Sequence, residues 1–343
     1  MPTKSNQTWV ATAGTGGLSD ALALARSDAS LPIAKVFEHF PELNAGIQLG
    51  SHAVRLLQDW GVTGDSGLKA VYPENVQIRR SDDAVVLGEL KLDEVARANY
   101  GAQYLTVNRA DLHVALMAHV DTLGDVVQAP EIATPATSWV WPWSGARNDG
   151  ENKGFALNEL NAAREAAANE CAPQTWSSVL TYRTIVPMSA MPIQWRKNDI
   201  GMWLGSNIQV VHYPISAGAM MSVTVTIDSE APVNGVDIGS VVSPKLVSYS
   251  AIDCCAKLRH FISAVNAAGA EWVNWPTGTY RAGSQVGAQS RQPVDWVGDA
   301  GRLNHPYGIY GESIGFKETT LAQARFEHIR NTSRVRASHS FLH

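Results

Sequence analysis

The chain has 343 residues, of which 45% are hydrophobic and 17% are charged. This composition can bury the core of one large domain or of two ordinary ones. The 27 Lys and Arg against 32 Asp and Glu give a formal net charge of −5, and the basic residues form no stripe that would follow a phosphate backbone. We therefore expect no nucleic-acid partner.

Targeting signals and metal motifs are also missing from the sequence. No apolar run approaches the ~20 residues that cross a bilayer, and the N-terminal residues are polar, which predicts a cytoplasmic protein without a membrane span. The three cysteines include an adjacent pair, Cys254 and Cys255, without CxxC spacing. The ten histidines show no HExxH pattern, so we predict no metal site.

The N-terminal segment has the pattern of a strand, a tight turn and a helix. The apolar run Trp9 to Ala11 leads into Gly14, Thr15, Gly16 and Gly17, after which apolar residues recur at helical spacing as far as Arg26. Glycines let a backbone approach a pyrophosphate, and the N-terminus of the helix adds N–H groups and a positive dipole end. By itself the pattern is more typical of an ordinary glycine-rich turn between a strand and a helix, with a nucleotide site as the alternative.

A second strand is expected from Ile33 to Phe37, parallel and adjacent to the first. It ends at Glu38, whose carboxylate can accept both ribose hydroxyls of a nucleotide, a contact worth roughly 1.5–3 kcal/mol. The first glycine of a GxGxxG pattern is replaced by Thr12. Glu38 therefore carries much of the support for a nucleotide site.

The rest of the chain divides into a mixed region and a strand-rich region. Helices are predicted at Ser51 to Trp60 and Arg109 to His119, and strands at Val76 to Ile78 and Ala84 to Leu92. Residues 121–177 show no clear pattern, apart from the alternating Trp139, Trp141 and Trp143 and an Ala- and Glu-rich helix. Four later strands with turns between them predict an antiparallel sheet: Val179 to Val186, Ile200 to Leu204, Ile208 to Pro214 and Met220 to Ile227. A last strand, Asp295 to Val297, precedes a basic helix, Thr320 to Ala337.

Two segments of the first half resemble the FAD-dependent aromatic hydroxylases, the group that includes salicylate and 3-hydroxybenzoate hydroxylases. AGIQLGSHAVRLL at residues 45–57 is similar to the motif GAGIQLGPNAxRxL, and YLTVNRADLH at residues 104–113 is similar to YxxxHRADLH. The resemblance implies that Gly46, Ile47 and Gln48 pass beside the flavin ring and that Arg109 contacts FAD.

Two segments of the second half extend this resemblance. WLG at residues 203–205 with VVHYP at residues 210–214 resembles WLGxxxHxVxYP, a pair of strands over the substrate. VGDA at residues 297–300, followed by Pro306 and Gly311, resembles GDAAHPMLPFLAQGA. The resemblance implies that Gly298 and Asp299 hold the ribityl chain of FAD, and that Pro306 and Gly311 line the flavin.

The chain also departs from the family pattern. The nearest match to the motif GADGxxSxxR is the longer Gly145 to Gly150, which contains Asp149, and Arg302 and Tyr310 replace a histidine and a glutamine of the last motif. These changes leave two alternatives open. One is another FAD- or NAD-linked oxidoreductase of the same fold, such as a dehydrogenase or halogenase. The other is a diverged, non-catalytic relative that binds FAD or an aromatic ligand.

The implied fold is α/β, with a Rossmann-like FAD-binding domain of the glutathione-reductase type and an antiparallel-sheet substrate domain. Residues 1–175 would form the first part of the FAD domain, although 70–108 have features of either side. Residues 176–285 would form the substrate sheet, and 286–343 would return to the FAD domain.

The implied activity is that of a monooxygenase. NADH or NADPH reduces FAD, and O2 supplies the hydroxyl group added to a small phenolic or hydroxybenzoate-like ring. His212 is the candidate acceptor of the phenol proton, with Tyr213 beside it, although alternation along a strand lets only one of the two face the pocket. Arg183 is the candidate partner of a substrate carboxylate, and Pro306 would also contact substrate. A core role for His212 and a solvated Arg183 are the alternatives, and we expect a monomer or homodimer.

Overall fold

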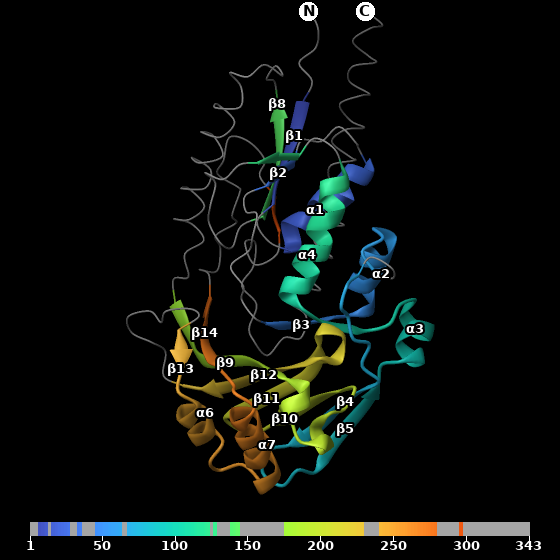
Figure 1. Cartoon of the computed structure of the whole chain (residues 1–343). Helices are drawn as coiled ribbons and strands as arrows, with labels where there is room; N and C mark the ends of the chain where they lie inside the picture. The colour runs from blue at the N-terminus through green and yellow to red at the C-terminus, as the bar shows by residue number, and fades with distance from the viewer. Residues whose placement is uncertain are drawn as a thin grey trace, which may run out of the picture.

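The computed structural model describes residues 6–12, 15–27, 33–35, 45–63, 67–123, 126–128, 138–144, 175–229, 240–279 and 295–297. Its strands form three sheets (Figure 1). A five-stranded sheet has the order β15-β8-β1-β2-β7, an eight-stranded sheet has the order β13-β14-β9-β12-β11-β10-β4-β5, and β3 pairs with β6 alone. The described part of the chain is thus an α/β structure.

The five-stranded sheet contains the predicted strand, helix and strand. β1 runs parallel to β2, with Val10 opposite Ile33, and β2 runs parallel to β7, whereas β8 is antiparallel to both β1 and β15. Helix α1 (Thr15–Ser27) connects the first two strands. The expected parallel, adjacent pair is therefore confirmed. The strands are β1 (Asn6–Thr12), β2 (Ile33–Lys35), β7 (Val126–Gln128), β8 (Ser138–Ser144) and β15 (Asp295–Val297).

Three helices and the two-stranded sheet lie between the larger sheets (Figure 1). α1 packs against α4 (Arg109–Val120), and α2 (Ser51–Asp59) follows β3 directly. β3 (Gly46–Leu49) is antiparallel to β6 (Leu105–Asn108). These elements share one core cluster, in which Leu18, Leu22, Leu49, Leu57, Leu105, Leu112 and Leu116 are buried.

The eight-stranded sheet is antiparallel except at one position. The predicted strands β9, β12, β11 and β10 are neighbours and antiparallel, as expected. β4, however, pairs parallel with β10, so the sheet as a whole is mixed, and β4 and β5 join it from the first half of the chain. Its strands are β4 (Asn75–Arg80), β5 (Val86–Lys91), β9 (Thr175–Pro187), β10 (Asp199–Leu204), β11 (Ile208–Ile215), β12 (Met220–Asp228), β13 (Val241–Val242) and β14 (Trp272–Thr279).

The two faces of the eight-stranded sheet have different neighbours. One face is covered by α6 (Pro244–Ser250) and α7 (Ala256–Ala267), which the sequence analysis did not predict (Figure 1). α7 buries Leu258, Phe261, Ile262 and Val265, a spacing that places all four on one side of a helix. The other face lies against β3 and β6. The remaining elements are α3 (Glu94–Tyr100), η1 (Asp121–Leu123), η2 (Met188–Ala190), η3 (Ile193–Trp195) and η4 (Ser216–Gly218).

Several predicted residues fall outside the described ranges. They include the 320–337 helix, the 145–150 turn and six site candidates, namely Gly14, Glu38, Gly298, Asp299, Pro306 and Gly311. In the parts that are described, no helix combines the length and the apolar character needed to cross a membrane.

Candidate functional site

Strand β3 lies directly against the eight-stranded sheet. A Cβ atom added to Gly46 would lie 2.5 Å from Ser222 Cβ on β12 and 2.8 Å from Tyr213 Cε2 on β11. Such separations are far below van der Waals contact, so only glycine fits at this position. The glycine of the flavin-side motif therefore allows the closest approach between β3 and the sheet.

A cluster of polar side chains is buried where β3 meets the sheet. Gln48 and Ser222 are 8% and 3% exposed, and Gln48 Oε1 accepts a hydrogen bond of 3.0 Å from Tyr104 Oη. Burial raises the pKa of Tyr213, against the opposing effects of hydrogen bonds with Ser222 and Gln48 and of the positive charge of Arg183. Tyr213 therefore stays a neutral phenol and can donate a hydrogen bond at neutral pH.

Hydrogen bonds fix the two parts of this junction to each other. Thr106 Oγ1 on β6 donates to the carbonyl oxygen of Pro214 at 2.6 Å, and Ser216 Oγ donates to Asp111 Oδ2 at 3.0 Å. The bond from Thr106 to Pro214 is buried, which strengthens it relative to one in water. β11 and the β6–α4 segment thus hold a defined position.

Arg109 is the first residue of α4 and lies beside the start of β3. Its backbone N–H donates to the carbonyl oxygen of Ala45 at 2.9 Å, and Asn108 caps the helix by accepting a 3.0 Å bond from the N–H of Ala110. The structure thus brings together Arg109 and the segment Gly46 to Gln48, which the resemblance assigned to one cofactor.

The first turn of α1 contains three of the residues that the sequence analysis predicted to bind a nucleotide. Thr15 and Gly17 are buried and Gly16 is partly buried, and Ser19 Oγ donates to the carbonyl oxygen of Thr15 at 2.6 Å. The first N–H groups of a helix have no acceptor within it and lie at its positive end. α1 is the helix that comes after β1 in the chain, as the sequence analysis expected.

His212 lies on the face of the sheet opposite to Tyr213. Its ring occupies the space beside Gly201, where an added Cβ would clash with the imidazole, and the centres of the His212 and Phe261 rings are 4.4 Å apart. Burial lowers the pKa of His212 to about 4, so the ring is neutral at neutral pH. The alternation expected along β11 therefore puts Tyr213, and not His212, toward β3.

Gln209, and not His212, occupies the position of the histidine in the family motif. In the motif WLGxxxHxVxYP the histidine precedes the tyrosine by four positions, and counting back from Tyr213 gives Gln209. Residues an even number apart on a strand share a face, so Gln209 lies on the Tyr213 face of β11.

No model of a protein family matches this sequence. The chain is 28% identical to 3-hydroxybenzoate 6-hydroxylase of Polaromonas naphthalenivorans (strain CJ2) over 327 residues, which is 92% of this chain and 78% of that protein. The resemblance to the FAD-dependent aromatic hydroxylases is confirmed. Three further hydroxylases or FAD-dependent monooxygenases are 24–27% identical, and the chain spans only 54–59% of their length.

Solved structures support the same fold. The structure of a salicylate hydroxylase substrate complex matches with a TM-score of 0.63 at 14% identity, over 91% of this chain and 77% of that one. Klebsiella pneumoniae HpxO complexed with FAD and uric acid matches with a TM-score of 0.60 at 16% identity, over 92% and 78% of the two chains. At identities of 14% and 16%, the similarity shows only that this chain shares the fold of these proteins.

Proposed function

We propose that this protein is an FAD-dependent monooxygenase that hydroxylates a small phenolic or hydroxybenzoate-like ring, using NADH or NADPH and O2. The observation that carries the proposal is the close approach of β3 to the sheet at Tyr213 and Ser222, because it joins the flavin-side motif to a buried polar surface. The relatives reported above, which act on such substrates by name, support the same activity.

FAD would be held by residues from both halves of the chain. Thr15, Gly16 and Gly17 would hold its pyrophosphate in a Rossmann-like βαβ unit, while Gly46, Ile47, Gln48 and Arg109 would lie beside the ring. From outside the described ranges we propose contacts by Gly14, Glu38, Gly298, Asp299, Pro306 and Gly311. When bound, FAD supplies the redox chemistry by accepting a hydride and activating O2.

The substrate would be positioned by the polar cluster beneath β3. Arg183 lies on the Tyr213 face of the sheet, since it pairs in register with Thr224, which pairs with Val211, and its guanidinium can bind a carboxylate through two hydrogen bonds. Tyr213 would donate a hydrogen bond to the phenolic oxygen. We assign this orienting role to Tyr213 and not to His212, because His212 faces α7. Burial of the cluster would exclude water from the reaction.

Purified full-length protein mixed with FAD tests the proposal. We expect flavin absorbance that stays with the protein after gel filtration, and NADH or NADPH oxidation stimulated by 3-hydroxybenzoate or salicylate with formation of a dihydroxylated product. Benzoate, which lacks the phenol, is the matched control and should give no product. Protein that takes up no FAD would contradict the cofactor, and substrate-stimulated oxidation without product would contradict hydroxylation.

A further inference from the structure

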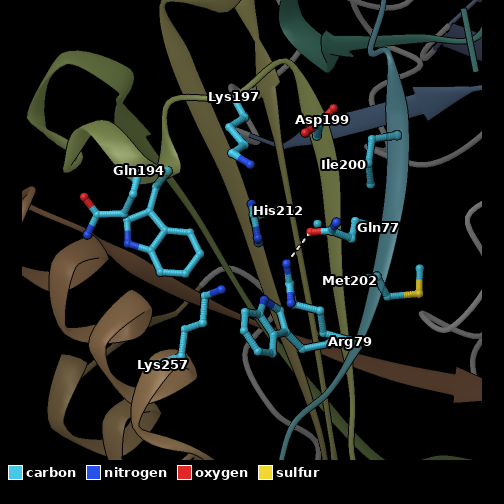
Figure 2. A pocket seen from close by; sticks show the side chains of 12 residues that line it. Gln77, Arg79, Gln194, Lys197, Asp199, Ile200, Met202, His212 and Lys257 are labelled. Carbon is cyan, nitrogen blue, oxygen red and sulfur yellow. Dashed lines mark hydrogen bonds between the residues drawn. The ribbon is translucent and has the colours of Figure 1, made fainter. Parts of the chain in front are cut away.

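A second cavity lies on the α7 face of the eight-stranded sheet, away from β3. It has a volume of about 260 Å³ and is lined by residues of β4, β10, β11, η3 and α7 (Figure 2). His212 lines it, whereas the adjacent Tyr213 is on the opposite face of the sheet. The sheet itself therefore separates this cavity from the site proposed above.

Three cationic side chains face this cavity. Figure 2 shows the ends of Lys197 and Lys257 pointing into the same space as the guanidinium of Arg79. The pKa of Lys257 is lowered by desolvation and by the charges of Arg79 and Lys197, so the three charges repel one another. Within the described part of the chain, none of the three forms an ion pair with a carboxylate. An anion in the cavity would relieve this repulsion.

The one carboxylate that lines the cavity has another contact. Asp199 Oδ1 accepts a hydrogen bond of 3.0 Å from Asn75 Nδ2 at one end of the cavity. Among the described residues that line the cavity, three cations therefore face one carboxylate, which leaves a net positive charge.

Arg79 is held in place before any ligand arrives. Its Nη2 donates to Gln77 Oε1 at 2.7 Å and its Nη1 to the carbonyl oxygen of Ala84 at 3.0 Å, and its guanidinium carbon lies 5.9 Å from the centre of the Trp203 ring. These contacts use two of the five N–H donors of an arginine. A pre-oriented guanidinium loses little entropy on binding a carboxylate.

The other walls of the cavity are aromatic. Trp203 is 1% exposed, and Trp195 packs edge-on against Phe261 with 4.8 Å between ring centres. Indole rings at a cavity wall favour a planar apolar group over a compact hydrated ion. The volume lies below the ~300–1,000 Å³ of sites for drug-sized ligands, so a single ring fits it best.

We propose that this cavity is a second ligand site, which binds a monocyclic aromatic carboxylate with its carboxylate at Arg79 and Lys257 and its ring against Trp195 and Trp203. Binding at this site requires neither FAD nor hydroxylation. Through it such an acid would affect the enzyme from the face of the sheet opposite to Tyr213.

Competitive labelling of lysines tests the site directly on the full-length protein. Trace acetic anhydride is added with and without benzoate, and the acetylation rate of each lysine is read by peptide mass spectrometry. We expect benzoate to slow the labelling of Lys257 by about fivefold when free benzoate is four times its Kd. Lys245, an exposed lysine outside the cavity, is the matched control and should keep its rate. An unchanged rate at Lys257, or equal slowing at Lys245, would overturn the proposal.

Two comparison ligands and two variants define the chemistry. Benzamide, which keeps the ring without the charge, and inorganic phosphate, which keeps the charge without the ring, should both protect Lys257 less than benzoate. Equal protection by either would refute an aromatic carboxylate as the ligand. In calorimetric titration Arg79→Gln should weaken benzoate binding at this cavity by about tenfold or more. Lys257→Gln should weaken it by about two- to fivefold, because Lys257 is exposed. If a variant fails to fold, labelling of the unmodified protein still decides.

Discussion

The two faces of the eight-stranded sheet are made by the same strands but have different surroundings. On the face toward β3, Gly46 brings a second backbone against Tyr213 and Ser222, and the polar groups hydrogen-bond with one another. On the face toward α7, His212 packs against Phe261 beside a cavity rich in positive charge. Adjacent residues of β11 therefore face different surroundings, and a role proposed for one cannot be transferred to the other.

The largest expected effect concerns the α7 face and follows from His212. Its pKa is about 4 in the folded protein against 6.5 as the ordinary value, so the unfolded chain binds the extra proton between these values. The contribution of the neutral His212 to the free energy of unfolding is fully present above pH 6.5. It is lost as the pH falls toward 4, which lowers the free energy of unfolding by up to about 3 kcal/mol.

Replacement of His212 tests the predicted loss of stability at low pH. Urea unfolding at several pH values should show that His212→Asn lowers stability at pH 7 but removes most of the decline between pH 6.5 and pH 4. His260→Gln, at an exposed histidine of α7, is the control and should keep the decline. A decline of unchanged size in His212→Asn would mean that His212 does not stay neutral in the fold.

The opposite face is tested through Arg183. If it binds the substrate carboxylate, Arg183→Met should lower kcat/KM for 3-hydroxybenzoate by about ten- to a hundredfold, the value of a charge-assisted hydrogen bond. Any turnover of phenol, which has no carboxylate, should change little. Arg97→Met, on the exposed helix α3, is the control for loss of a positive charge. Equal losses with both substrates would remove Arg183 from carboxylate binding.

The contact between β3 and the sheet is tested at Gly46. Gly46→Ala forces a Cβ against Ser222 and Tyr213 and should destabilise the protein by about 1–3 kcal/mol, the usual cost of overpacking. Ser222→Gly in the same chain removes one of the two clashes and should recover part of the loss in urea unfolding. Gly88→Ala, where an added Cβ meets nothing within 4 Å, is the matched glycine control. No loss in Gly46→Ala would show that β3 can move away from the sheet.

The elements that the sequence predicted are those with local signals. Glycines mark the β1–α1 turn, and apolar alternation marks β9 to β12, so both were found. α7 carries an equally local signal. Its buried residues recur at helical spacing, so the helix was predictable from the sequence: Leu258, Phe261, Ile262 and Val265. The parallel pairing of β4 with β10 is different, because Asn75 and Asp199, which meet there, are 124 residues apart. No local pattern records such a pairing.

The residues of the candidate site were likewise predictable only where a local motif marks them. Motifs identified Gly46, Gln48 and Arg109 one at a time, and the structure brings these segments together. Alternation predicted that His212 and Tyr213 would face opposite sides, but which residue faces β3 depends on the register of β11 within the sheet. The cluster of Arg79, Lys197 and Lys257 could not be predicted, because its members come from three distant segments and none belongs to a motif.

The smallest expected effect concerns two helix caps, one on each side of the eight-stranded sheet. Asn108 caps α4 beside β3 with a 3.0 Å, part-buried bond, whereas Ser243 caps α6 on the other side with an exposed 3.3 Å bond. Asn108→Ala should cost about 1 kcal/mol in urea unfolding, and Ser243→Ala should cost less, because water can replace an exposed, longer bond. Asn108→Asp keeps an acceptor at the cap and should restore most of the stability. A larger loss from Ser243→Ala than from Asn108→Ala would mean that the α7 side, and not the β3 junction, limits the stability of the protein.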